Sequence, residues 1–201
     1  MSVLRSLLRP RDEARTVQAT AWGEWPGGSG VETWAGTSVS ADNAMQLLTV
    51  YGCVAFIVDG ITTLPIDCYR ETSAGKVELD KPGWLRNPTP DLDFASWASQ
   101  VLTSLLIDGN AYCWLRFQPG SGVRELVPID PSQVTVTRDR GRKTFLIGGV
   151  FYDSTQVWHV PALMYPGALT GLSPVEMARQ TIGAGMAAEQ FAGTFFDQGA
   201  T

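Results

Sequence analysis

The chain has 201 residues, of which 44% are hydrophobic and 17% are charged, and its formal net charge is −5. This length is enough for one domain with a sizeable core, or for two small ones at most. The acidic balance argues against a protein whose whole surface grips nucleic acid. One histidine and three cysteines without metal-ligand spacing argue against a zinc site, and no apolar run reaches the roughly 18 residues of a membrane span.

Residues 1–39 are predicted to form a flexible N-terminal arm. Within it, the stretch 20–38 is rich in Gly, Ser and Thr, with Trp22, Trp25 and Trp34 interspersed. Such a composition favours an extended or disordered chain. Because an exposed tryptophan leaves a large apolar surface in water, we expect the arm to lie on a neighbouring molecule or on its own domain.

The first predicted helix runs from residue 41 to about residue 62. Ser40 is a suitable N-cap, and Pro65 prevents the helix from continuing. Apolar residues recur at spacings of three and four, which predicts one broad buried face. The positions on this face are Ala44, Leu47, Leu48, Tyr51, Ala55, Val58 and Ile61.

A second helix is predicted over residues 94–107, with Asp93 as its N-cap and with Gly109 and Asn110 as its stop. After it, the hydrophobic period changes to two, which predicts strands. Short strands are expected over 66–70, 76–79, 111–117, 124–128, 134–137, 144–147, 150–152 and 157–160. Helices packed on a small antiparallel sheet are the simplest arrangement, so we predict an α+β fold for residues 40–170.

The last predicted element is a long helix within residues 171–201. Ser173, Pro174 and Glu176 have the spacing of an N-cap, a first helical position and a capping-box partner, and Gly199 marks the end. Glycine and alanine are frequent inside this helix, so another backbone can approach it closely and we expect a packing partner. The contact candidates are Gly183, Gly185, Ala188, Glu189, Ala192 and Gly193.

No catalytic constellation stands out in the sequence. His159 lies in a predicted strand, where we expect it to be hydrogen-bonded beside the sheet. The sequence has no G-x-x-x-x-G-K-[ST] or G-x-G-x-x-G motif for binding phosphate. Asp108 and Asp130 could meet in space and hold Mg²⁺, although no spacing in the sequence indicates it.

One basic cluster is present, at the tip of a predicted hairpin. Arg138, Arg140, Arg142 and Lys143 surround Gly141. A solvated turn accounts for them, and a contact with nucleic-acid phosphate or with an acidic neighbour is the alternative. No aromatic residues interleave the cluster, which disfavours binding to single strands.

Several short stretches of the sequence follow one another in an order that indicates a protein family. They are VYGCV (50–54), TLPI (63–66), LRNP (85–88), LIDGNAY (106–112), LVPIDP (126–131), VWHV (157–160), LTGLSP (169–174) and FFDQGA (195–200). Together, from about residue 40 to 200, they make the chain resemble the portal proteins of tailed bacteriophages, a large family of long-tailed phages. The first forty residues carry no part of this resemblance.

The resemblance implies a ring, commonly of twelve subunits, at one vertex of the capsid, through which double-stranded DNA enters and leaves. The expected partners are sister subunits, the major capsid protein, the terminase large subunit and the head–tail connector or adaptor. It implies no enzyme activity, catalytic residue, metal or cofactor, because the terminase hydrolyses ATP. It places the protein in the virion, after assembly in the host cytoplasm and without a membrane.

In such proteins, residues like 40–170 form the wing, and the helix within 171–201 is the first stem helix, which ends where the clip begins. A family member normally continues well past this point, so the chain corresponds to the N-terminal half. The helix carries one basic residue, Arg179, against three acidic ones. That balance suits DNA that must pass without sticking, because each neutralised phosphate adds to the grip.

Two other classes of protein stay open on the residues alone. One is a metal-dependent hydrolase or nuclease that uses Asp108 and Asp130. The other is a monomeric adaptor that binds a partner through the helix at 173–197.

Overall fold

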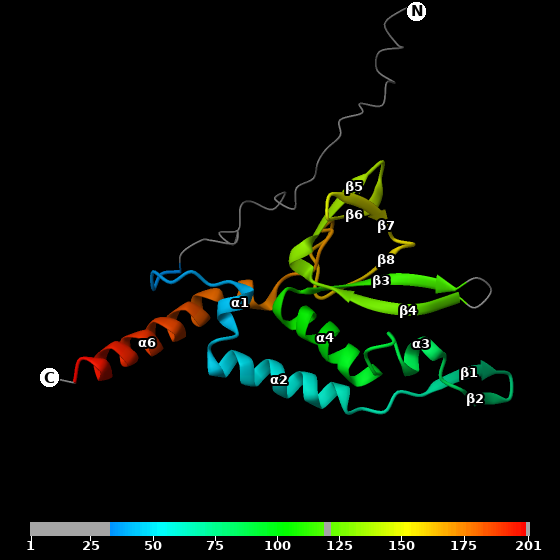
Figure 1. The fold of residues 1–201 in the computed structure, drawn as a ribbon, viewed down its shortest axis with the longest axis horizontal. Helices are drawn as coiled ribbons and strands as arrows, with labels where there is room; N and C mark the ends of the chain where they lie inside the picture. Colours follow the sequence, from blue (N-terminus) through cyan, green and yellow to red (C-terminus); the bar gives the residue numbers. More distant parts are fainter. Residues whose placement is uncertain (1–32, 119–121, 200–201) are drawn as a thin grey trace, which may run out of the picture.

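The computed structural model describes residues 33–118 and 122–199, and Figure 1 shows how their elements are arranged. The helices are α1 (Ala41–Ala44), α2 (Leu48–Thr62), α3 (Gly83–Arg86), α4 (Phe94–Ile107), α5 (Pro174–Met177) and α6 (Arg179–Asp197), with a 3₁₀-helix η1 at Pro131–Gln133. The strands are β1 (Cys68–Thr72), β2 (Gly75–Leu79), β3 (Asn110–Gln118), β4 (Gly122–Ile129), β5 (Val134–Asp139), β6 (Arg142–Ile147), β7 (Val150–Asp153) and β8 (Val157–Pro161). The predicted α+β class is confirmed. Most of the predicted arm, residues 1–32, lies outside the described residues.

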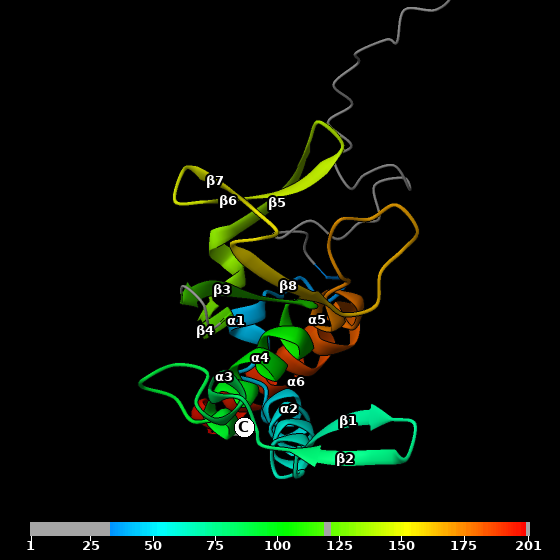
Figure 2. The same cartoon turned by 90° about the vertical axis from the view of Figure 1, so that its right-hand side faces the viewer.

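The strands form three antiparallel sheets, and the prediction of a single small sheet is wrong. β1 pairs with β2, β3 lies between β4 and β8, and β6 lies between β5 and β7. Periodicity places strands along the chain but does not say which of them pair. Figure 2 shows the β1–β2 hairpin standing away from the other two sheets.

Two clusters of buried side chains hold the larger sheets and α4 together. In the first, α4 packs on β3 and β4 through Trp97, Ala98, Val101, Ala111, Cys113 and Leu126. The second joins the β4-β3-β8 sheet to the β5-β6-β7 sheet through Tyr112, Ile129, Phe145 and Val157. Each large apolar side chain buried in this way contributes about 1.5–3 kcal/mol.

The bounds of α4 are those that the sequence predicts. The Asp93 carboxylate accepts a hydrogen bond from the Ser96 N–H at 2.8 Å, which satisfies one of the free N–H groups at the helix start. The Cys113 thiol lies beneath this helix, and burial raises its pKa to about 12. A thiol with so high a pKa is unreactive at neutral pH.

The first predicted helix is broken into α1 and α2 at residues 45–47. Ser40 caps α1 as expected, and the Asn43 side-chain oxygen accepts a hydrogen bond from the Ser40 N–H. Leu47 then turns to extended backbone, with φ −72° and ψ 115°, and packs in a cluster with Val175 and Ile182. Tertiary packing therefore overrides the helical periodicity at this point.

The predicted buried face of this region is only partly correct. Val54 and Val58 of α2 are buried, whereas 76% of Leu48 and 54% of Tyr51 are exposed. Because α2 begins anew after the break, its rotation about its own axis differs from that of one continuous helix.

The predicted C-terminal helix is also broken, into α5 and α6 at Ala178. Ser173 accepts the Glu176 N–H at 3.1 Å, which confirms the N-cap, but Ala178 leaves helical geometry with φ −94° and ψ 5°. The turn lets Ile182 and Gly183 become buried against the body. From Ala188 onward, every described residue of α6 is exposed, and Figure 1 shows the helix projecting from the body.

Candidate subunit interface

The contact candidates on α6 divide between its packed and its projecting half. A Cβ on Gly183 would lie 2.6 Å from side-chain atoms of Thr33, and one on Gly185 would lie 3.2 Å from Leu47 Cδ2. The nearest neighbours of these two glycines therefore belong to the same chain. The other four candidates lie on the projecting half and are exposed: Ala188, Glu189, Ala192 and Gly193.

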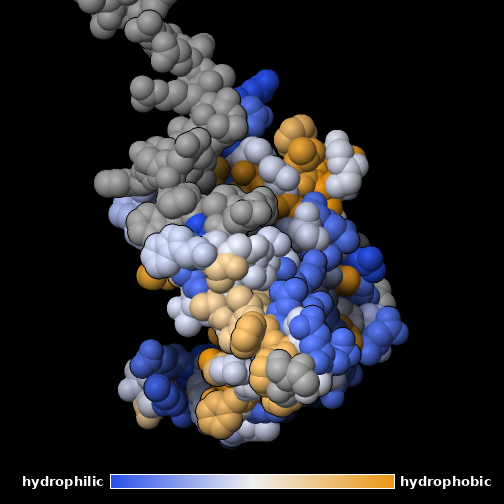
Figure 3. Space-filling model, turned by 90° about the vertical axis from the view of Figure 1, so that its left-hand side faces the viewer, coloured by the Kyte–Doolittle hydropathy of each residue, from blue (hydrophilic) through white to orange (hydrophobic). Residues whose placement is uncertain are grey.

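Three aromatic residues share the projecting half of α6. Phe191, Phe195 and Phe196 are 73%, 47% and 75% exposed. Phe191 stacks on Phe195 with ring centroids 6.3 Å apart, and Phe195 meets Phe196 edge to face at 5.7 Å. Figure 3 looks onto the C-terminal end of α6 and shows hydrophobic surface gathered around it. Contiguous apolar surface of this kind is typical of a contact with another molecule.

Helix α2 presents a second apolar surface that the sequence reading missed. Its Val54 and Val58 face the body, yet Leu48 and Phe56 are 76% and 81% exposed. Asp59 is the one charged residue within α2. A helix with apolar residues around its whole circumference is normally buried on all sides. This pattern is the sequence signal that predicts a second contact face on α2.

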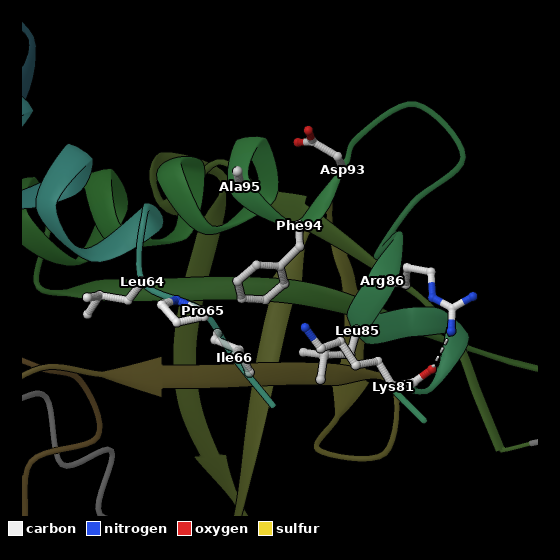
Figure 4. A pocket seen from close by; sticks show the side chains of 9 residues that line it. All are labelled: Leu64, Pro65, Ile66, Lys81, Leu85, Arg86, Asp93, Phe94 and Ala95. Carbon is white, nitrogen blue, oxygen red and sulfur yellow. Dashed lines mark hydrogen bonds between the residues drawn. The ribbon is translucent and has the colours of Figure 1, made fainter. Parts of the chain in front are cut away.

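A hollow of about 350 Å³ lies between the segment after α2, helix α3 and the start of α4. Figure 4 shows its lining, which is Leu64, Pro65, Ile66, Lys81, Leu85, Arg86, Asp93, Phe94 and Ala95. The floor is apolar. The charged groups at the rim already have partners, since the Lys81 ammonium lies 3.3 Å from Asp67 and Arg86 donates to the Lys81 carbonyl oxygen at 3.3 Å. The hollow therefore has no arrangement that indicates catalysis.

The predicted basic tip is the turn between β5 and β6. Arg140 and Gly141 form the turn, with φ of 48° and 81°. Arg138 pairs opposite Lys143 across the hairpin, so these two side chains start on one face of it. Arg142 pairs opposite an acidic neighbour, Asp139, on the other face.

Two of the four basic residues interact with side chains outside the turn. The ammonium of Lys143 contacts Nδ1 of His159 and is half-buried, so it does not belong to the exposed tip. Arg142 lies near Asp153, whose pKa is lowered mainly by hydrogen bonds from Thr155 and further by this guanidinium. The tip therefore presents Arg138 and Arg140 as its exposed cations without an acidic residue opposite them.

In the acidic pair of the hydrolase hypothesis, Asp108 is the C-cap of α4 and Asp130 is the N-cap of η1. Burial raises the pKa of Asp108, a hydrogen bond from Asn110 lowers it, and the nearby charge of Asp130 raises it again. Asp130 Oδ1 itself accepts the Ser132 N–H at 2.9 Å as the cap of η1. Within residues 33–118 and 122–199 there is no group of three or more His, Cys, Asp or Glu side chains placed to hold a metal ion.

Known proteins match this chain over most of its length. The sequence model of the family described as "Phage portal protein" matches residues 48–201. The chain is 30% identical over 183 residues to the "Probable portal protein" of Streptomyces phage phiC31, a match that covers 83% of this chain and 40% of that protein. No helix in the described part of the chain is both long and apolar enough to cross a membrane.

Solved structures share the fold. The chain superimposes on a chain in the "Neck of empty GTA particle" with a TM-score of 0.65 at 19% identity, over 85% of this chain and 49% of the other. It superimposes on a "HK97 Family Phage Portal Protein from Corynebacterium diphtheriae" with a TM-score of 0.60 at 12% identity, over 78% and 49%. The chain thus spans less than half the length of each of these proteins.

Proposed function

The chain belongs to the phage portal protein family, and we propose on this ground that it is a subunit of the ring at the portal vertex of a capsid. The family match over residues 48–201 is the observation that carries the proposal. In this role the protein forms the channel through which double-stranded DNA is packaged and ejected. It is a structural component of the virion, assembled in the host cytoplasm, and has no enzyme activity of its own.

The domains follow from the same proposal. Residues 40–170 form the wing, α6 is the first stem helix, and the chain after it leads into the clip. The ring, most simply a dodecamer, contacts the major capsid protein, the terminase large subunit and the head–tail connector. One of the solved structures with this fold comes from the neck of a particle, which supports the proposed place at the portal vertex.

Two apolar surfaces on different elements support ring closure. A cyclic ring needs heterologous contacts, in which one face of each subunit fits a different face of the next. The projecting half of α6 and the outer face of α2 are both apolar and exposed, and they lie on different elements. We assign the exposed residues Ala188, Ala192 and Gly193 to such a contact, in place of Gly183 and Gly185.

The charge of the projecting half suits a channel. Glu189 and Asp197 are its charged residues, so it offers DNA phosphates no cation. A channel wall without cations lets DNA slide, because phosphate neutralisation is what makes binding tight and salt-dependent.

The proposal is tested by removing apolar surface from α6. We expect the double variant Phe191→Ser with Phe196→Ser to keep its circular dichroism and melting temperature, because both side chains are exposed. Mass photometry should show loss of rings in this variant. Phe151→Ser on β7 is the matched control, since Phe151 is 63% exposed and lies outside α6. Equal ring formation in the wild type, the double variant and the control contradicts the assignment of the projecting half of α6 to the subunit contact.

Crosslinking separates a ring subunit from a monomeric adaptor that uses the same helix. A cysteine at position 192 carrying a short photoreactive crosslinker should capture a sister subunit in the assembled particle. Capture of a foreign protein, and never of a sister subunit, favours the adaptor.

A further inference from the structure

The start of β3 meets the loop that leads into α5, and the two backbones lie directly against each other. Gly109 has a φ of 79°, and a Cβ there would overlap with the carbonyl group of Leu172. A Cβ on Gly171 would overlap with the carbonyl oxygen of Gly109. Both positions therefore require glycine, and Gly109 also requires it for its left-handed backbone.

The side-chain amide of Asn110 joins the two backbones at this point. Its Oδ1 accepts the Gly171 N–H at 2.6 Å, and its Nδ2 donates to the Gly171 carbonyl oxygen at 3.2 Å. Nδ2 also donates to the backbone oxygen and to the carboxylate of Asp108, at 3.3 and 3.1 Å. Because a backbone N–H can only donate, Gly171 fixes which way the amide points. The amide thus pairs with both polar groups of one residue, as a neighbouring strand would.

The same oxygen fixes the position of the proton on His159. Nε2 of His159 lies 3.0 Å from Asn110 Oδ1, and an amide oxygen only accepts, so Nε2 carries the proton. Nδ1 of the neutral ring is then bare and accepts from the Lys143 ammonium that contacts it. Burial lowers the pKa of His159 to about 4, with a further contribution from Lys143, so the ring is neutral at pH 7. The two hydrogen bonds of the His159 ring therefore run in one direction, from the Lys143 ammonium to Nδ1 and from Nε2–H to the Asn110 oxygen.

This chain of hydrogen bonds crosses three elements of the body. Lys143 lies on β6, His159 on β8 and Asn110 on β3, so the two larger sheets are both included. The loop that they hold continues to Ser173, whose hydroxyl donates to the Ile107 carbonyl oxygen at 2.6 Å and caps α5.

We propose that Asn110 is a latch, a positioning residue that fixes the loop before α5 to both sheets of the body and sets the tautomer of His159 in doing so. The latch determines where the C-terminal helical segment starts relative to the body. All of its groups belong to one chain, so the inference does not depend on the proposed function.

A residue that only ended helix α4 would need neither of the two features that distinguish Asn110. An asparagine after a helix can satisfy its own turn through a local bond, as the bonds to Asp108 do here. The pairing with both groups of Gly171 connects residues that are 61 positions apart. The sharing of Oδ1 with His159 connects a further strand, and Asn110 as a whole is 5% exposed.

The tautomer is the sharper test, because the chain contains a single histidine and its ring signals need no assignment. Long-range ¹H–¹⁵N correlation spectra of the wild-type chain at pH 7 should show the neutral ring protonated on Nε2. A ring protonated on Nδ1 would overturn the proposal without any variant being made. The Lys143 ammonium can only donate to Nδ1 and therefore favours the same tautomer, so the contribution of Asn110 is measured in the Lys143→Met background. Lys143→Met should retain the Nε2 proton because Asn110 is still present, whereas Lys143→Met with Asn110→Ala should give a mixture of tautomers.

The positioning role is tested by double electron–electron resonance spectroscopy, which measures the distance between one spin label on the body and one on α5. Cys53 and Cys68 are replaced by serine, and spin labels are placed at Ser154, in the exposed turn after β7, and at Met177, which is 51% exposed. We expect one narrow distance distribution in the otherwise unchanged chain and a broadened one in Asn110→Ala. Thr144→Val is the matched control, because it removes the side-chain bond between Thr137 and Thr144 at 2.9 Å, away from the loop.

Asn110→Asp separates the two parts of the latch. Its carboxylate still accepts from His159 and from Gly171 N–H, but it can no longer donate to the Gly171 carbonyl oxygen. The Nε2 proton should therefore persist while the distance distribution broadens. A distribution as narrow as that of the wild type in both Asn110 variants shows that packing alone places α5, and the latch is then wrong.

Discussion

The loop before α5 and the projecting half of α6 are attached to the molecule in opposite ways. The loop is held by direct backbone packing at Gly109, by the Asn110 amide and by Ser173, while every described residue from Ala188 onward is exposed. The first region is completed within the chain. The second leaves apolar side chains in water, where the proposed ring places a neighbouring subunit.

Glycine shows the difference most plainly. A Cβ on Gly109 would overlap with a neighbouring carbonyl, whereas a Cβ on Gly193 would meet no atom of the described residues within 4 Å. The same residue type is thus a steric requirement in one region and an ordinary helical position in the other. Substitutions in the two regions should therefore change stability by very different amounts.

The largest effect is expected for Gly109→Ala. We expect a loss of at least about 3 kcal/mol in the free energy of unfolding, because alanine is strained at a φ of 79° and its Cβ overlaps with Leu172. Urea denaturation measures it. Gly193→Ala is the matched control and should gain up to about 1 kcal/mol from helix propensity. If the two variants lose equal stability, the contrast between the regions fails.

A smaller effect is expected for Ser173→Ala. This variant loses the cap of α5 and also the bond to the Ile107 carbonyl oxygen, so we expect a loss of about 2 kcal/mol. Ser40→Ala is the comparison, because Ser40 caps α1 by local bonds, and its loss should be about 1 kcal/mol. Thermal unfolding of both variants gives the difference, and equal losses would mean that the bond to Ile107 stabilises nothing.

The smallest effect is expected from the titration of His159. Its folded-state pKa of about 4 lies below the ordinary value of 6.5, so the unfolded chain takes up the proton first as the pH falls. Stability is fully present above about pH 6.5 and is lost towards pH 4. Because the ring is only half-buried, we expect a loss of about 1 kcal/mol, less than the shift alone would give.

The comparison with His159→Gln isolates this contribution. Burial raises the pKa of Asp108 and of Glu176, which adds stability as the pH falls and opposes the histidine. These carboxyl groups are present in both proteins and cancel in the difference between their pH profiles. A difference that stays flat between pH 6.5 and 4 would falsify the assigned environment of His159.

Local signals in the sequence predicted the elements that local chemistry determines. Helix α4 has its predicted bounds because Asp93 caps it and Gly109 follows it. The strands fall close to the predicted positions because alternation is a property of neighbouring residues. The family resemblance rests on several short stretches in order, and the family match confirms it.

Contacts between distant residues account for what the sequence did not predict. Nothing near residues 45–47 marks a helix break, since Leu47 turns out of the helix to reach Val175 and Ile182. Pairing into three sheets is likewise non-local. The sequence predicts a helix stop at Gly109 and Asn110 and a helix start at Ser173 and Pro174. Only the fold shows that they meet, and that Gly183 and Gly185 face Thr33 and Leu47 of their own chain.

The most direct test of the central claim is the oligomeric state of the intact protein, imaged by electron microscopy after purification from assembled particles. A portal subunit should give closed rings of one subunit number with a central channel, and a label on residue 192 should lie at a contact between neighbouring subunits. An intact protein that remains a stable monomer at all concentrations, with residue 192 free in solution, would contradict the account.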